Sequence, residues 1–216
     1  MLRFHRFDGV SLGIIALTGG LGAALHGRLP ARVATHFDLQ GAPNGWMDRT
    51  TAVLFLPLFS LGIWGLIRVS YFLMPEGRRK GVDAGILPMV AALTVAFMAA
   101  IQAIILRMAL VPGAALDRPL LVVMGGFWVA LGLVMPRVRQ NPFVGVRTAW
   151  TLSSPENWAR THRFAGYAMC MGGAFGLLMA TWGTATVTAI GIAGMLASAL
   201  VPAVYSVVLS FRLKKE

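Results

Sequence analysis

The sequence is dominated by apolar runs of about 20 residues, the length at which an α-helix crosses the hydrocarbon core of a bilayer. Hydrophobic residues make up 57% of the 216 residues and charged residues only 12%, against about 25% in soluble domains. This pattern predicts an all-α integral membrane protein. About six transmembrane helices are expected, over the approximate ranges 8–26, 51–74, 84–110, 120–135, 164–182 and 187–211.

The distribution of Lys and Arg predicts the orientation. Thirteen of these residues fall on the side that holds both termini, the loop 75–83 and the segment 136–163, against four on the other side. Because cytoplasmic loops are rich in Lys and Arg, we expect both termini inside and the segment 27–50 outside. Such loops also explain the net charge of +11, so nucleic acid is not an expected partner.

The expected organisation is a helix pair with a structured outer loop, residues 1–83, followed by a four-helix region with a structured inner loop and helix, residues 84–216. The first apolar run exceeds the usual length of a signal-peptide core, so we expect it to remain as a span. Cys170 is the single cysteine, which excludes an intrachain disulfide and favours a small packing residue.

Several residues inside the spans predict local contacts. Arg68 and Arg107 lie near span ends and are expected to snorkel to the headgroups, with an ion pair as the alternative. Gln102 lies mid-span and requires a partner on a neighbouring helix. Small residues permit close packing of the last two helices, and the positions expected at this contact are Gly172, Gly176 and Gly194.

The longest polar interruption, residues 136–163, is the main candidate functional segment. Asn141 and Gly145 predict a turn-rich loop, and Arg147 with Thr148 suits an anion such as a lipid phosphate. Trp150 is expected at headgroup depth.

A helix is expected to follow this loop. Either Ser154 caps it with Pro155 at the first position, or Ser153 caps it with Glu156 closing a capping box. Neither serine has an evident acid–base partner, so neither is expected to be a nucleophile.

On this expected helix, Glu156 and Arg160 have the spacing of an exposed ion pair, and Trp158 and His162 share one face. Two interpretations stay open. In one, the segment only positions the next span. In the other, it docks a cytoplasmic protein or holds a titrating His162, with contacts made by Arg147, Trp150, Trp158, Arg160 and His162 on a backbone set by Asn141, Gly145, Ser153 and Pro155.

The outer segment, residues 29–46, has turn residues and apolar anchors and is expected to form a folded hairpin or short cap on the membrane. Its candidate binding residues are His36, Asp38, Asn44 and Trp46. One interpretation is a lid that closes the helix bundle, and the other is a surface for an external ligand. A metal site built from His26, His36 and a carboxylate is a further alternative, although the spacing matches no known signature.

Two stretches carry a family resemblance. The run NPFVGVRTAWTLSSPENWARTHRFAG, residues 141–166, resembles the signature of the SdpI family of bacterial integral membrane proteins. The run LPARVATHFDLQGAPNGW, residues 29–46, is similar to the pattern of an uncharacterised domain that often precedes that signature.

The resemblance implies a non-enzymatic immunity and signal-transduction protein of the bacterial inner membrane, with no cofactor. Its implied partners are the lipid bilayer, a secreted toxic peptide outside and a cytoplasmic repressor inside. The alternatives are a small transporter, favoured by Gln102 and the prolines within spans, and a metal-dependent membrane enzyme that uses the outer His and Asp residues.

Overall fold

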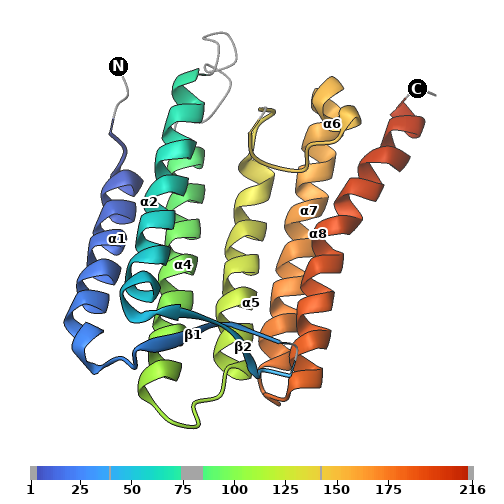
Figure 1. Ribbon diagram of the computed structural model, residues 1–216. Coiled ribbons are helices and arrows are strands. Elements are labelled where there is room, and N and C mark those ends of the chain that lie inside the picture. The colour runs from blue at the N-terminus through green and yellow to red at the C-terminus, as the bar shows by residue number, and fades with distance from the viewer. Residues whose placement is uncertain (1–3, 39, 74–84, 142, 214–216) are drawn as a thin grey trace.

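The computed structural model describes residues 4–38, 40–73, 85–141 and 143–213. Within these residues, six long helices run side by side, with the start of the first and the end of the last at the same end of the bundle (Figure 1). They are α1 Arg6–Leu25, α2 Arg49–Leu73, α4 Ile86–Leu110, α5 Asp117–Val134, α7 Pro155–Met179 and α8 Ala185–Leu213. The predicted fold class is confirmed.

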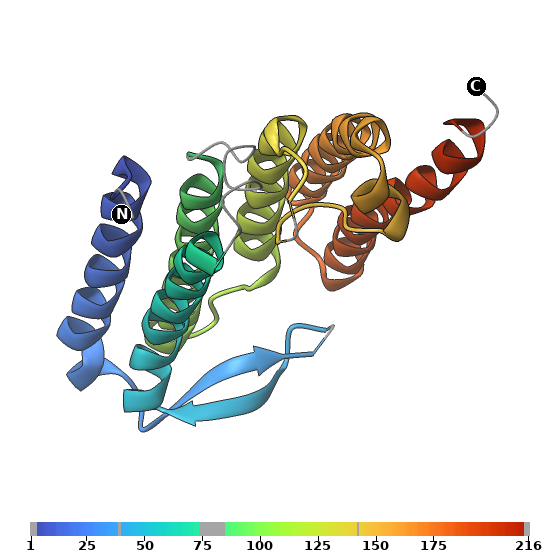
Figure 2. The ribbon, with the colours of Figure 1, turned by 90° about the horizontal axis from the view of Figure 1, so that it is seen from above.

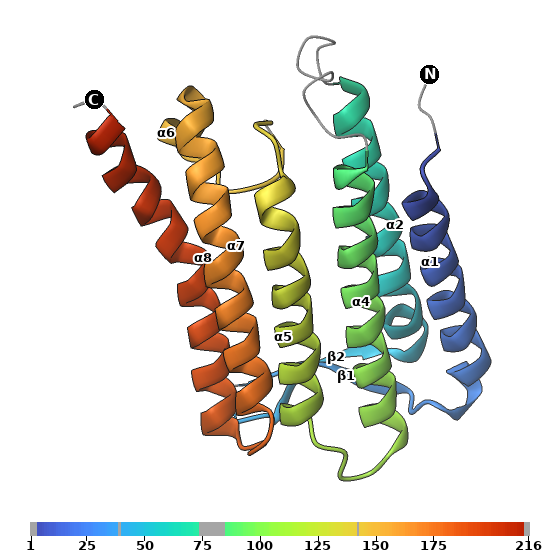
Figure 3. The same cartoon turned by 180° about the vertical axis from the view of Figure 1, so that it is seen from behind.

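Two smaller elements mark the two ends of the bundle. The short helix α6, Ala149–Ser153, lies at the end that holds the start of α1, and the strands β1, Arg32–Phe37, and β2, Pro43–Asp48, lie at the opposite end (Figures 1 and 3). Short 3-10 turns, His26–Arg28 and Met135–Arg137, follow α1 and α5. We call the α6 end the inner end and the strand end the outer end, after the expected orientation.

Five of the long helices are apolar enough over their length to cross a membrane: α1, α2, α4, α5 and α8. The exception within the described chain is α7, whose first turns carry Glu156, Arg160 and Arg163 before the apolar run begins at Phe164. It nevertheless packs along both α5 and α8. The sixth expected crossing therefore corresponds to the apolar part of α7, extended by a polar helical start.

The outer segment forms an antiparallel hairpin, as the turn residues predicted. Val33 of β1 is 1% exposed and packs with Ala52 and Ile105, which fixes the hairpin to α2 and α4. At the tip, the Asp38 carboxylate accepts hydrogen bonds from the amides of Gln40 and Ala42, at 2.9 and 2.8 Å. Seen from above, the hairpin lies along one side of the row of helices (Figure 2).

The contact between α5 and α7 depends on glycines that face each other in antiparallel register. A Cβ on Gly173 would lie 2.6 Å from the carbonyl oxygen of Gly125, and a Cβ on Gly132 would lie 2.9 Å from that of Gly166. Two helix backbones approach this closely only where no side chain intervenes. The glycines in each helix are seven residues apart, so they stay on the face turned toward the partner helix.

The predicted packing of α7 against α8 is also observed. Gly172 and Gly176 are buried, and Cβ atoms there would meet Ser198 and Met195 of α8. A Cβ on Gly194 would lie 2.7 Å from the Phe175 ring. These small residues let α7 lie close to both neighbours at once.

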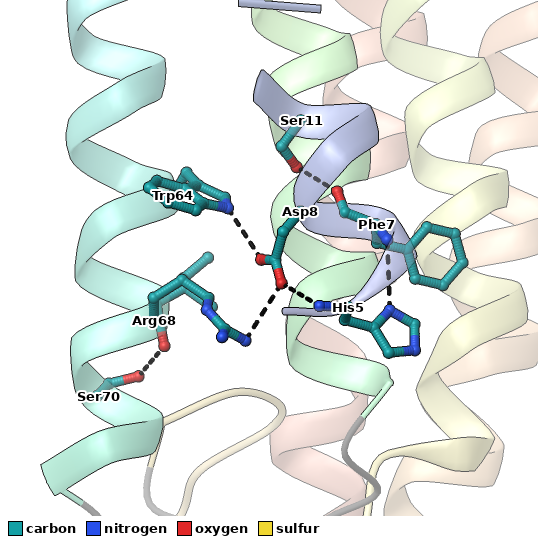
Figure 4. Close-up of polar contacts among 8 residues, drawn as sticks. His5, Phe7, Asp8, Ser11, Trp64, Arg68 and Ser70 are labelled. Atoms are coloured by element: carbon teal, nitrogen blue, oxygen red, sulfur yellow. Dashed lines mark hydrogen bonds and ion pairs between the residues drawn. The ribbon is translucent and has the colours of Figure 1, made fainter. Parts of the chain in front are cut away.

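Of the two alternatives for Arg68, the structure has the ion pair and not snorkelling: its guanidinium is 3.4 Å from the carboxylate of Asp8, whose side chain is fully buried (Figure 4). The same carboxylate accepts hydrogen bonds from Trp64 Nε1 at 3.0 Å and from the His5 amide at 2.7 Å. A buried ion pair is weak evidence of net stabilisation. It does fix α1 against α2.

The other two polar side chains singled out within the spans lie on α4. Gln102 Nε2 donates to the carbonyl oxygen of Ala52 in α2 at 3.0 Å, as expected for an amide that must find its partner inside the protein. Arg107 is exposed near the end of α4, and its guanidinium lies 3.5 Å from the carbonyl oxygen of Ala115. Whether it reaches the headgroups stays a prediction.

Substituting Gly173 with Ala is expected to destabilise the protein by about 1–3 kcal/mol, the usual cost of overpacking. The new Cβ would meet backbone atoms of Gly125 and Val129, which cannot move unless the helices separate. Gly13→Ala is the matched control, because a Cβ at this exposed position meets nothing within 4 Å. The midpoint of thermal unfolding in detergent measures both, and equal midpoints would contradict the α5–α7 contact.

Thiol labelling tests the orientation, in a Cys170→Ser background. Gln40 lies at the hairpin tip and Ser153 at the end of α6, and both are exposed. Gln40→Cys is expected to react with a membrane-impermeant reagent in whole cells, and Ser153→Cys only after permeabilisation. Labelling in the reverse order would invert the topology. The cluster Arg78, Arg79 and Lys80, which contributes to the charge count, lies outside the described residues.

Candidate functional site

The loop between α5 and α6 is held in one conformation by the side chain of Asn141. Its Oδ1 accepts from the amides of Phe143 and Val144, both at 2.8 Å, and its Nδ2 donates to the carbonyl oxygens of Arg139 and Val144. The side chain is 5% exposed. One amide group therefore supplies four hydrogen bonds to a turn that would otherwise leave buried backbone groups unpaired.

His162 holds the next part of the loop from α7. Its Nε2 accepts from the Val146 amide at 3.1 Å, and its Nδ1 lies 2.9 Å from the carbonyl oxygen of Trp158. This pattern requires a neutral ring with the proton on Nδ1. Gly145 has a φ of +120°, and a Cβ there would collide with the imidazole, so the position requires glycine.

Trp158 lies against the His162 ring, one turn earlier in α7. It is 2% exposed, it stacks on His162 with ring centroids 4.0 Å apart, and its Nε1 donates to the carbonyl oxygen of Val138 at 2.7 Å. The structure thus gives Trp158 and His162 a structural role, and contact of either side chain with a partner stays a prediction. Both side chains hold the loop in place, because each of their ring nitrogens has a hydrogen-bond partner inside the protein.

Thr148 and Thr151 start the short helix α6. Thr148 caps it, with its Oγ1 3.2 Å from the Thr151 amide, and Thr151 Oγ1 bonds back to the carbonyl oxygen of Val146 at 2.8 Å. Thr148 Oγ1 also lies 2.9 Å from Ser206 Oγ, which joins α6 to α8. Thr148 is thus a cap, a role that leaves it little freedom to bind an anion.

Of the two caps considered for the following helix, the structure has Ser154. Its Oγ accepts from the Asn157 amide at 3.1 Å and Pro155 takes the first position, whereas Ser153 is the last residue of α6. Asn157 is a structural residue that the sequence does not predict. It is 1% exposed and donates from Nδ2 to the carbonyl oxygen of Ser206 at 2.9 Å. The only signal for this role in the sequence is the spacing of Asn157 and Thr161, one helical turn apart, which permits their hydrogen bond.

Four of the predicted inner residues remain exposed: Arg147, Trp150, Glu156 and Arg160. Glu156 and Arg160 form the expected ion pair at 2.6 Å, with both side chains about half exposed, so its contribution to stability is small. Arg147 has no hydrogen bond or ion pair within the described part of the chain. It lies beside a groove of about 370 Å³ between α7 and α8, lined by Met135, Ala165, Met169 and Pro202 among others.

At the outer end, the His and Asp residues do not converge on one point. His26 Nε2 lies 3.0 Å from Thr50 Oγ1, His36 bonds Asn44, and Asp38 holds the hairpin tip. No group of three or more His, Cys, Asp or Glu that could hold a metal ion occurs among the described residues.

Asp48 ends β2 and caps α2. Its carboxylate accepts from the amides of Thr50 and Thr51 and from the Thr51 hydroxyl. The Thr51 hydroxyl and amide, with the Thr50 amide, hold the pKa of Asp48 below its usual range.

Three of the four outer candidates do share a cavity. His36, Asp38 and Asn44 line a space of about 560 Å³ between the hairpin and helices α4, α5 and α8. Trp46 lies apart from it, 47% exposed with the Arg32 guanidinium 6.0 Å from its ring centroid. Asp117 and Thr188 also line this cavity, which no sequence pattern predicts because they come from helices distant along the chain.

The fold and these two sites define a multi-pass helical membrane protein with a built structure at each end. Residues 137–206 match the model of the SdpI/YfhL protein family, and residues 13–61 match that of a domain of unknown function, DUF1648. The chain thus carries an SdpI/YfhL region preceded by a DUF1648 region, which confirms the resemblance found in the sequence. No curated protein and no solved structure matches the chain.

The family match covers the inner loop, α6, α7 and most of α8, and the DUF1648 match covers most of α1, the hairpin and the start of α2. The predicted boundary between the two parts of the chain, at residues 83 and 84, stays a prediction. It falls within residues 74–84, which lie outside the described residues.

Trp158→Phe is expected to lower the midpoint of thermal unfolding by the equivalent of about 1–3 kcal/mol, the cost of a buried group left without its hydrogen bond. The phenyl ring keeps the packing but leaves the carbonyl oxygen of Val138 unpaired. Trp150→Phe is the matched control, at a position 38% exposed, and is expected to leave the midpoint nearly unchanged. An equal effect of both changes would show that Trp158 is not a structural anchor.

Proposed function

We propose that this chain is a non-enzymatic membrane immunity protein of SdpI type in the bacterial inner membrane. In this proposal the outer end meets a membrane-active toxic peptide, and the inner end signals to a cytoplasmic regulator. The SdpI/YfhL match supports the immunity class. The placement of a cavity at one end and a rigid, exposed loop at the other supports a task with two faces.

The observation that carries the proposal is the state of Arg147. Its neighbours are fixed: Val146 is bonded through its amide to His162 and through its carbonyl oxygen to Thr151, and Thr148 caps α6. A scaffold of partly buried hydrogen bonds therefore holds one exposed guanidinium, without a partner in the described chain, at the edge of an apolar groove. Preorganisation of this kind lowers the cost of binding.

The chemistry of this surface indicates what it would bind. A guanidinium presents several donors in a fixed plane and grips a carboxylate at two points. The groove beside it is lined by Met, Ala and Pro side chains, which suit an apolar side chain. The proposed partner segment therefore combines an acidic residue with a neighbouring apolar one.

Arg147→Lys tests this role. The charge is kept, but a Lys ammonium cannot copy the two-point geometry, so protection is expected to fall at least about tenfold, equivalent to about 1.4 kcal/mol. Folding is expected to be unchanged because the side chain is exposed. The measurement is survival of a sensitive strain challenged with the peptide toxin of SdpI-type systems, alongside the protein level in the membrane fraction.

Arg139→Lys is the matched control, since Arg139 is also exposed on the inner loop but does not line the groove. It is expected to protect like the wild type. Full protection by Arg147→Lys at normal protein level would contradict the role of Arg147. A wild-type chain that gives no survival advantage would contradict the immunity function.

A further inference from the structure

The cavity at the outer end is closed on one side by the hairpin. The roof comes from residues 35–38, 41 and 44, and the walls come from α4, α5 and α8, which lie beside the hairpin in Figures 1 and 2. Its volume of about 560 Å³ falls within the range of small-molecule sites, about 300–1,000 Å³. It is too small for a folded partner but large enough for a molecule of ten to twenty non-hydrogen atoms, on the order of 20–30 Å³ each.

The walls are apolar. Ile101, Ile104 and Ile105 of α4 face Leu120 of α5 and Ile192 of α8 across the space. These three helices belong to different parts of the chain, so the cavity exists only in the assembled bundle. An occupant must present apolar surface to these walls.

One buried hydroxyl in the cavity lacks a partner. Thr188 is 7% exposed, and its Oγ1 makes no hydrogen bond within the described structure. A Thr in a helix usually bonds the carbonyl oxygen one turn earlier. The Thr188 hydroxyl makes no such bond to Thr184 and is left unpaired, on a residue that lines the cavity. Leaving such a group unpaired costs free energy, which a ligand atom would recover.

Two carboxylates line the same space. Asp117 stands in the first turn of α5, and Asp38 lies at the hairpin tip with one oxygen engaged by two backbone amides. Neither carboxylate has an ion pair with a Lys, Arg or His in the described part of the chain. The cavity therefore combines apolar walls with negative charge and an unsatisfied hydroxyl.

We propose that this cavity is a binding site for a small amphiphilic cation, a molecule with an apolar body and a primary ammonium group. The apolar body lies against α4, α5 and α8. The ammonium pairs with Asp117, with Asp38 as a second counter-charge, and donates to the Thr188 hydroxyl. An ammonium has three donors and can serve all three groups, whereas an anion would be repelled by both carboxylates. The site stands independently of the proposed immunity function.

The test uses a decylamine that carries a photoreactive diazirine on its chain, with the full-length protein in phosphatidylcholine nanodiscs. After irradiation, mass spectrometry locates the label. Cross-links are expected on the wall segments around Ile104, Leu120 and Ile192, and unlabelled decylamine is expected to compete. The matched decanol probe, which has the same chain without the charge, is expected to label these segments about tenfold less, as for the loss of about 1.4 kcal/mol.

Variants separate recognition from simple partitioning into the apolar space. Asp117→Asn and Thr188→Val are each expected to reduce labelling by the amine severalfold, and Ala189→Phe, which places a ring in the cavity, is expected to abolish it. Glu156→Gln at the inner end and Thr94→Val on α4 remove the same groups away from the cavity and are expected to label like the wild type.

Three outcomes would overturn the proposal: equal labelling by amine and alcohol, labels outside the cavity walls, or wild-type labelling of Asp117→Asn. Thermal unfolding midpoints show that each variant is folded. Should Asp117→Asn not fold, unchanged labelling of Thr188→Val and Ala189→Phe overturns the proposal by itself.

Discussion

The close approach of the α5 and α7 backbones is the constraint on which the inner end depends. Because Gly125 faces Gly173 and Gly132 faces Gly166, the two helix backbones approach closely at two points, about two helical turns apart. A Cβ on Gly166 would also meet the Pro136 ring, so the chain leaves α5 directly against α7. The loop that follows therefore lies close enough to α7 for His162 and Trp158 to bond Val146 and Val138. A wider helix separation would break these bonds.

Away from water, each polar group requires an internal partner, and the fold meets this requirement with bonds that also join helices. Asp8 with Arg68 and Trp64 joins α1 to α2, Gln102 joins α4 to α2, and Trp128 Nε1 with Ser198 Oγ at 3.0 Å joins α5 to α8. Two buried side-chain atoms among the described residues lack a partner, Gln102 Oε1 and Thr188 Oγ1. The amide of Gln102 is engaged through its nitrogen, whereas the hydroxyl of Thr188 lines a cavity. The unpaired hydroxyl of Thr188 thus belongs to the proposed binding site, where a ligand would supply the missing hydrogen bond.

Sequence patterns predicted what depends on local chemistry. Apolar run length predicted the six helices, turn residues in the outer segment predicted the hairpin, and Ser154 before Pro155 predicted the start of α7. They failed where the outcome depends on a distant neighbour. The sequence favours a contact role for Trp158 and His162, because nothing in their own helix shows that the loop folds over them. The sequence favours snorkelling for Arg68, because its ion-pair partner Asp8 lies 60 positions earlier and no local pattern links the two. The outer cavity escaped prediction for the same reason, since its walls come from three separated helices.

Helix α8 connects the two candidate sites physically. Thr188 and Ile192 line the outer cavity, and Ser206 bonds Thr148 of α6 and Asn157 of α7 at the inner end. These contacts are separated by about 27 Å at a rise of 1.5 Å per residue. Pro202 lies between them and removes one helical hydrogen bond. Beyond Pro202, Tyr205 stacks on Phe164 of α7 and Ser206 bonds Asn157 of α7, and only the end of α8 leans away from α7 (Figures 1 and 3). A ligand shifts such an element only by its difference in affinity for two positions of the helix. An occupant that engages Thr188 touches the outer part of α8 directly, whereas the α6 cap is held to the inner part through Ser206. Helix α8 therefore contacts both the outer cavity and the α6 cap, on opposite sides of Pro202.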